Sequence, residues 1–171
     1  MTITTPRLEL VAATFEHCAA EISDIAALGT MLDASVPDDW PPPLNDEHSQ
    51  RFFLETLRER PGSVGWSVWY FILRSEGART VIGNGGFKGE PRDGAVEIGY
   101  SIVPTFQRRG FADEAVEALA QWAFADSRVD RVIAEALLEL EASIAVLRKT
   151  GFRACDGASE PGLLRFERMR S

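Results

Sequence analysis

Residues 97–119 read EIGYSIVPTFQRRGFADEAVEAL, and the spacing of their apolar side chains changes at Pro104. Before this proline, residues 95–103 place apolar side chains at every second position, which predicts a β-strand. After it, apolar residues return every three or four positions, which predicts a helix over 109–125. The stretch therefore predicts a strand, a turn and a helix, with the turn built around QRRGFA at 107–112.

The segments on either side of this unit complete the pattern of a mixed sheet. Three successive strands joined by short turns predict an antiparallel meander, and the strand–helix–strand order that follows predicts one parallel crossover. We expect an α/β fold in one domain over 1–171, with its core in 7–169: a mixed, mostly antiparallel sheet flanked by helices. The further strands expected are 7–12, 65–73, 80–88, 131–137, 152–155 and 163–169, and the further helices are 14–20, 46–60 and 142–149.

Composition and charge narrow the class of protein. The 171 residues are 45% hydrophobic and 26% charged, as in a globular domain with its own core. The net charge of −8 argues against a nucleic-acid partner, which needs a basic footprint. Cys18 and Cys155 form no disulfide framework, and no metal-ligand spacing occurs, so no metal is expected. With no signal peptide and no apolar run long enough for a bilayer, we expect a cytoplasmic protein without a membrane partner.

The turn at the start of the central helix carries the most informative chemistry. It comprises Gln107, Arg108, Arg109, Gly110, Phe111 and Ala112. The first N–H groups of a helix have no partner within the helix and carry a partial positive charge, which suits a phosphate. Gly110 has no Cβ to keep a diphosphate away from the main chain, and the two arginines can add charge-assisted contacts. An ordinary strand–helix turn with a convenient glycine is the alternative interpretation of the same six residues.

Two stretches of the sequence, taken together, resemble a known protein family. The stretch at 97–119, followed by ASIAVLRKTGF at 142–152, resembles the GNAT N-acetyltransferase superfamily, and within it the ribosomal-protein N-terminal acetyltransferase branch. The turn at 107–112 matches the Q/R-x-x-G-x-G/A motif that binds acetyl-CoA in this superfamily. The order of elements is similar from Arg7 to Met169, so the resemblance covers nearly the whole chain.

The resemblance implies a cofactor site with roles for particular residues. It implies acetyl-CoA as co-substrate, with main-chain groups of Ile102 and Val103 pairing with the pantetheine arm and the amides of 109–112 holding the pyrophosphate. Ser143 matches a small polar residue near the sulfur, and in the ribosomal-protein branch a serine there is thought to protonate the leaving thiolate. Where relatives often carry Asn and Tyr, this chain has Leu140 and Leu147, so the usual tyrosine acid is missing.

Fewer residues in the sequence indicate where the acceptor amine binds and which group removes its proton. Glu97 is the candidate general base, because a primary amine is mostly protonated at neutral pH and must lose a proton before it attacks. Glu135 is the backup for this role. Trp40, in a proline-rich loop, is expected to line the acceptor site or to fasten that loop to the core. Tyr100 is expected in the acceptor site or in the core, and Arg7 as a plain surface charge.

The combined expectation is an acetyl-CoA-dependent N-acetyltransferase that transfers acetyl directly to a primary amine. A protein N-terminus and a small-molecule amine both remain open as acceptors. The alternative is a weak or inactive acyl-CoA-binding or sensor domain of the same fold, since the usual Asn and Tyr are absent. Relatives often dimerise, so a homodimer is also open.

Overall fold

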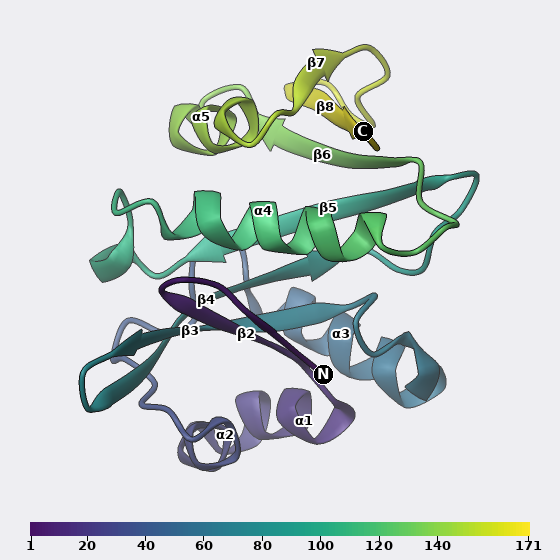
Figure 1. Cartoon of the computed structure of the whole chain (residues 1–171). Coiled ribbons are helices and arrows are strands. Elements are labelled where there is room, and N and C mark those ends of the chain that lie inside the picture. Colours follow the sequence, from purple (N-terminus) through teal and green to yellow (C-terminus); the bar gives the residue numbers. More distant parts are fainter.

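The computed structural model describes residues 1–171 as one eight-stranded sheet with five α-helices (Figure 1). The strand order is β1-β2-β3-β4-β5-β6-β8-β7, and all neighbours are antiparallel except β5 and β6. The strands are β1 (Thr2–Thr4), β2 (Leu8–Ala12), β3 (Val68–Ser75), β4 (Ala78–Phe87), β5 (Ala95–Ile102), β6 (Arg131–Leu137), β7 (Arg153–Cys155) and β8 (Leu163–Met169). The helices are α1 (Phe15–Ser23), α2 (Ile25–Leu32), α3 (Glu47–Glu59), α4 (Phe111–Phe124) and α5 (Glu141–Lys149), with single 3₁₀ turns at Pro61–Ser63 and Pro104–Phe106.

The predicted fold class, the antiparallel meander β3-β4-β5 and the parallel β5-α4-β6 crossover are confirmed. Two elements are additional to the prediction. β1 is a three-residue strand on the edge of the sheet. α2 follows α1 directly at Asp24, whose side chain accepts a hydrogen bond from the Ala27 amide and so caps a new helix. The sequence IAALGTML of α2 is apolar almost throughout, so it shows no helical period.

Helices cover the two faces of the sheet unequally. On one face α4 and α5 bury the larger cluster, with side chains such as Phe71, Ile98 and Leu119 at most 2% exposed. On the other face α1, α2 and α3 bury a smaller cluster that includes Tyr70 and Ile72 of β3. No residue of β5, β6 or β8 belongs to this second cluster. The half of the sheet that carries Glu97 is therefore free of helices on that face.

The parallel pairing of β5 with β6 is short. It runs only from Ala95 opposite Arg131 to Ile98 opposite Ala134, although β5 continues to Ile102 and β6 to Leu137. Beyond Ile98 the two strands separate. Their separated ends lie beside the turn that leads into α4 and beside the start of α5, at the left of Figure 1. The fold therefore opens its sheet next to the predicted phosphate-binding turn.

Candidate active site

The turn into α4 leaves an uninterrupted row of main-chain donors unpaired. Arg108 and Gly110 adopt left-handed conformations with φ of 60° and 78°, so the helix begins at Phe111 rather than at Arg109 as expected. No hydrogen bond of the structure uses a backbone N–H of residues 108–113 as its donor. No side chain caps the helix either. Six successive N–H groups are therefore free to bind an anion.

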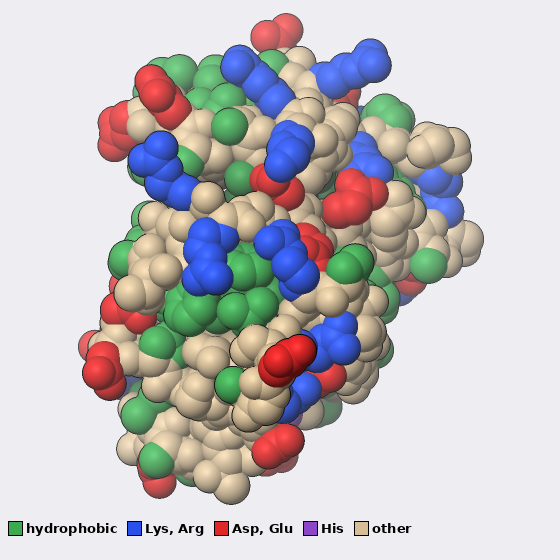
Figure 2. Space-filling model, turned by 60° about the vertical axis from the view of Figure 1, so that its left-hand side comes forward, with side chains coloured by type: hydrophobic (Ala, Val, Ile, Leu, Met, Phe, Trp, Pro, Cys, Tyr) green, Lys and Arg blue, Asp and Glu red, His purple; other side chains and the backbone are tan.

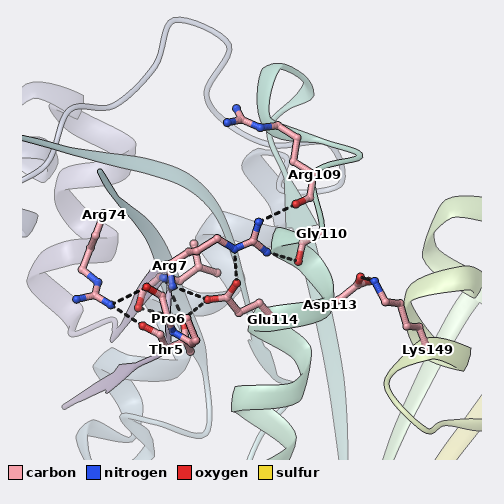
Figure 3. A network of polar contacts seen from close by, with 10 residues as sticks. Thr5, Pro6, Arg7, Arg74, Arg109, Gly110, Asp113, Glu114 and Lys149 are labelled. Carbon is pink, nitrogen blue, oxygen red and sulfur yellow. Dashed lines mark hydrogen bonds and ion pairs between the residues drawn. The ribbon is translucent and has the colours of Figure 1, made fainter. Parts of the chain in front are cut away.

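Arg7 fixes the shape of this turn (Figure 3). Its guanidinium donates to the carbonyl oxygens of Arg109 (2.9 Å) and Gly110 (3.1 Å), and its Nε donates to a carboxylate oxygen of Glu114 (2.7 Å). The Arg7 amide donates to the other oxygen of that carboxylate at 2.8 Å. Because both turn carbonyls are held on the side of Arg7, the same peptides are kept in one orientation. The expectation that Arg7 is a plain surface charge is wrong, because its role depends on contacts distant in sequence.

A shallow depression of about 500 Å³ lies beside this turn, and no hydrophobic residue lines it. Its carboxylates are already paired: Asp113 with Lys149, Glu114 with Arg7 and Glu117 with Arg168. Burial raises the pKa of Glu114, but hydrogen bonds from Thr5 and Arg7 outweigh it and leave that pKa below its ordinary value. Its lining residues are Arg7, Arg109, Gly110, Asp113, Glu114, Glu117, Lys149 and Thr150.

The side chains of Arg108 and Arg109 at the turn have no carboxylate partner. Arg108 and Arg109 take part in no salt bridge. The Arg109 guanidinium lies over the rings of Phe106 and Phe111, at 5.4 and 5.1 Å from their centroids. Phe111 itself is buried, and Ala112 packs against the core. Both arginines are therefore available to an anion bound at the N–H row.

The open edge of β5 offers further main-chain groups. Along the β5 ladder the Glu97 carbonyl and the Val103 amide bond to the β4 side, so the alternation directs the Tyr100 and Ile102 amides toward β6. The Val103 amide donates to Ile82 and its carbonyl accepts from Phe106, so both groups of Val103 are engaged. Val103 therefore has no free main-chain group for the contact expected of it, whereas the Tyr100 and Ile102 amides face the open edge.

Gln107 and Ser143 stand on opposite sides of the gap between β5 and β6. The Gln107 side-chain Nε2 donates to the Ile102 carbonyl at 2.8 Å, which closes the turn against the strand. The Tyr100 hydroxyl donates to the Ser143 carbonyl at 3.0 Å and lies 3.1 Å from the Ser143 hydroxyl. Burial is the main cause that raises the pKa of Tyr100 to about 12, so this phenol stays protonated at neutral pH. Tyr100 thus spans the gap from the α4 face, packed against the core.

Leu140 and Leu147 lie where the resemblance leads one to expect a polar pair. Leu140 is the residue before α5 and makes no side-chain cap, and Leu147 is 1% exposed in the larger core cluster. Neither supplies a proton donor. The hydroxyl groups of Ser143 and Tyr100 are the ones the structure brings to this position.

Glu97 lies on the face of β5 that carries no helix. It forms an ion pair with Lys88, the residue after β4, and its side chain is 27% exposed. Two residues further along, a Cβ built on Gly99 would have no atom within 4 Å, so the space above this glycine is open. Glu135 is less available: the amide and hydroxyl of Ser159 bind its carboxylate, and its side chain is 6% exposed.

The loop between α2 and α3 is fastened over the end of this face. The Asp39 carboxylate accepts from the amide (3.1 Å) and hydroxyl (2.6 Å) of Thr105. Trp40, which precedes a cis peptide bond to Pro41, donates its indole N–H to the partly buried Glu21 at 3.2 Å. Trp40 packs partly buried against the smaller cluster, so the fastening role foreseen for it is the one its contacts show.

Glu21 is a site feature that sequence reasoning missed. Its carboxylate accepts three hydrogen bonds, from Tyr70 (2.6 Å), Asn45 (2.9 Å) and Trp40. Burial raises its pKa above the ordinary value, against the opposing effect of these donors. Only the tertiary fold brings α1, β3 and the loop together, so no local pattern could have indicated this cluster.

The side of the molecule with the separated ends of β5 and β6 comes forward in Figure 2. Hydrophobic side chains gather there, with Lys and Arg side chains directly beside them. No group of three or more His, Cys, Asp or Glu side chains is placed to hold a metal ion. None of the helices is both long and apolar enough to cross a membrane.

Comparison with known proteins agrees with this geometry. The profile of the acetyltransferase (GNAT) domain matches residues 7–153. The chain belongs to the GNAT acetyltransferase family. Within that family it is 29% identical over 102 residues to the uncharacterized N-acetyltransferase YjdG of Bacillus subtilis (strain 168), and the match covers 59% of this chain and 60% of the relative.

Solved structures share the GNAT fold over almost the whole chain. An acetyltransferase from Agrobacterium tumefaciens str. C58 has a TM-score of 0.65 at 20% identity, covering 99% of this chain and 95% of that one. RimL, a ribosomal L7/L12 α-N-protein acetyltransferase in complex with coenzyme A, has a TM-score of 0.64 at 21% identity, covering 99% and 98%. At these identities the likeness establishes the fold, and activity has to be argued from the site.

Proposed function

We propose that this GNAT protein is an acetyl-CoA-dependent N-acetyltransferase that transfers acetyl directly to a primary amine. The observation that carries the proposal is the row of free N–H groups at 108–113, beside a sheet that opens at the same place. A pyrophosphate and an extended amide-bearing arm match these two features. The RimL structure, a fold relative, contains coenzyme A.

The pyrophosphate is proposed to lie on the amides of 109–112, with Arg108 and Arg109 neutralising its charge. The pantetheine arm would enter the gap beyond Ile98 and pair with the free edge of β5. The Tyr100 and Ile102 amides are then the donors available to the thioester carbonyl. A donor fixed before the reaction stabilises the oxyanion as it forms, and the loss of one such donor typically costs about 10²-fold in rate.

The acceptor amine is proposed to approach from the helix-free face, above Gly99. Glu97 on that face removes a proton from the ammonium form, directly or through a water molecule. The neutral amine then attacks the thioester carbon, the C–S bond breaks, and CoA leaves as a thiolate. The nitrogen loses its second proton to solvent as the amide forms. The Ser143 hydroxyl, hydrogen-bonded to Tyr100, is the proposed proton donor to that thiolate.

The proposal is tested by thiol release from acetyl-CoA in the presence of a panel of primary amines. We expect release that depends on the amine, and an acetylated amine of matching amount by mass spectrometry. Calorimetry with CoA alone is the companion measurement. If CoA produces no binding heat and no amine is acetylated, the proposed function is wrong.

A second candidate is supported by Leu140 and Leu147, which leave α5 without the usual polar pair. A domain of this kind would bind acyl-CoA without transferring the acyl group. Calorimetric binding of CoA together with no acetylation of any amine in the panel would favour this candidate over the enzyme.

A further inference from the structure

A β-bulge determines which way Asn84 faces. In the pairing of β3 with β4, Phe71 lies opposite Gly83 and Ile72 lies opposite Val81, so Ile82 is an extra residue. Val81 belongs to the smaller cluster and Ile82 to the larger one. Simple alternation from Val81 would send residue 84 toward α4. The extra residue reverses this and places Asn84 on the face that carries Glu97 and Gly99.

Asn84 is the middle member of a polar row across three strands. It lies opposite Tyr70 of β3 and opposite Ser101 of β5. Both neighbours are committed: the Tyr70 hydroxyl donates to Glu21, and the Ser101 hydroxyl donates to the Pro43 carbonyl of the loop above. The row therefore has its two ends tied to surrounding elements.

The Asn84 carboxamide, in contrast, has no partner. The residue is 5% exposed, yet none of the side-chain hydrogen bonds of the structure includes it. The fully sealed side-chain atoms without a partner are Ser67 Oγ and Arg131 Nε, so the amide atoms of Asn84 still reach open space. A ligand that covered this space without pairing with the carboxamide would leave it buried without a hydrogen bond, which costs about 1–3 kcal/mol. A bulge that aims such a group at a surface points to a ligand there.

Open space lies diagonally next to Asn84. Gly99 is two residues before Ser101 on the same face, about 7 Å along the strand, and nothing would meet a side chain there. Glu97, the proposed base, lies two residues further along this face. An acceptor amine above Gly99 would thus have its carboxylate on one side and the Asn84 carboxamide on the other.

We propose that Asn84 binds the acceptor, and that it pairs with a carboxamide or peptide group attached next to the reacting amine. The Asn84 side chain has an NH₂ group that donates and a carbonyl oxygen that accepts hydrogen bonds. It can therefore pair with both the C=O and the N–H of a peptide group, whereas a protonated polyamine has only N–H donors. The acceptor class is then an α-amino amide, such as a peptide N-terminus. This inference rests on the proposed function and narrows its acceptor.

The test compares two acceptors, glycinamide and ethylamine, in wild type and in Asn84→Ala. For each acceptor the kcat/KM of the variant is divided by that of wild type, which cancels the different basicity of the amines. We expect about a tenfold loss with glycinamide, within the range for one removed hydrogen bond, and less than a twofold loss with ethylamine. The KM for acetyl-CoA should stay unchanged. Equal losses for both amines, or no loss for either, would overturn the assignment.

Ser67→Ala is the matched control, because Ser67 is also buried and also lacks a partner. It should leave both acceptors unaffected. Neither substitution should lower the melting temperature, since each removes an unsatisfied polar group; a clear drop in Asn84→Ala would indicate a structural role instead.

A binding measurement separates this subsite from turnover itself. With CoA present, glycinamide should shift the side-chain amide resonance of Asn84 in ¹⁵N NMR, assigned through Asn84→Ala, and ethylamine should not. A shift without acetylation would contradict the proposed function and leave the subsite standing. Acetylation of glycinamide without the shift would contradict the subsite alone.

Discussion

At the scale of single residues, the base role proposed for Glu97 leads to a prediction about the pH dependence of the reaction. Its carboxylate pairs with the exposed Lys88 and faces the open side of β5. A base is needed most when the amine is protonated, so Glu97→Gln should lower kcat/KM about 10²-fold near pH 7 and by less as the pH approaches the pKa of the amine. The measurement is a pH profile of kcat/KM for both proteins, and a variant at full rate across the range would remove Glu97 as the base.

Some single-residue features could be predicted from sequence and others could not. The roles suggested for Gly110 depend on a local strand–turn–helix pattern, and the structure indeed gives this residue a positive φ. Asn84 could not be identified, because its direction depends on a bulge that the local alternation hides. The prediction for Arg7 is wrong for a related reason: its partners at Arg109, Gly110 and Glu114 are over 100 positions away.

At the scale of elements, the contact between the segment before β2 and the start of α4 shapes the anion site. Arg7 alone bridges the two turn carbonyls and Glu114. Arg7→Ala should therefore weaken CoA binding by about tenfold or more by calorimetry, since charge-assisted hydrogen bonds are worth about 1.5–3 kcal/mol. Arg7→Lys should not restore the affinity, because an ammonium group cannot reproduce the planar fork.

Arg51→Ala is the control for Arg7, since Arg51 forms an exposed pair with Glu47 on α3, away from the turn. That substitution should leave CoA affinity within twofold of wild type. If Arg7→Ala and Arg51→Ala bind CoA equally well, the turn does not depend on Arg7.

The elements themselves were largely predictable, because their signals are local. Asp46 caps α3 at the start of the helix predicted over 46–60, and β6 has the predicted bounds. The separation of β5 from β6 could not be predicted in this way. It depends on how many residues of the two strands pair, and the sequence of neither strand determines that number. α2 is absent from the prediction because its sequence is apolar almost throughout and shows no helical period.

At the scale of the whole molecule, Glu21 couples stability to pH. Its pKa is raised in the folded state, mainly by burial, so the folded protein loses stability as pH rises from the ordinary glutamate pKa through the raised one. Glu21→Gln keeps a carbonyl for Trp40 and Asn45 and an amide for Tyr70, and cannot ionise. The difference in unfolding free energy, variant minus wild type, should therefore increase with pH across that window.

Urea unfolding of both proteins at several values between pH 4 and 8 measures this difference. Glu9 and Glu117 have lowered pKa values, so their contribution to the unfolding free energy increases as pH rises. Both proteins contain these carboxyls, so this contribution cancels in the difference. A difference that stays constant or falls with rising pH would show that Glu21 does not carry the effect.

The most direct test of the whole account is a crystal structure of the protein with CoA. We predict the pyrophosphate oxygens within hydrogen-bonding distance of the amides of 109–112 and the pantetheine arm between the separated ends of β5 and β6. The nucleotide bound elsewhere, with those amides still unpaired or turned toward protein acceptors, would contradict the account.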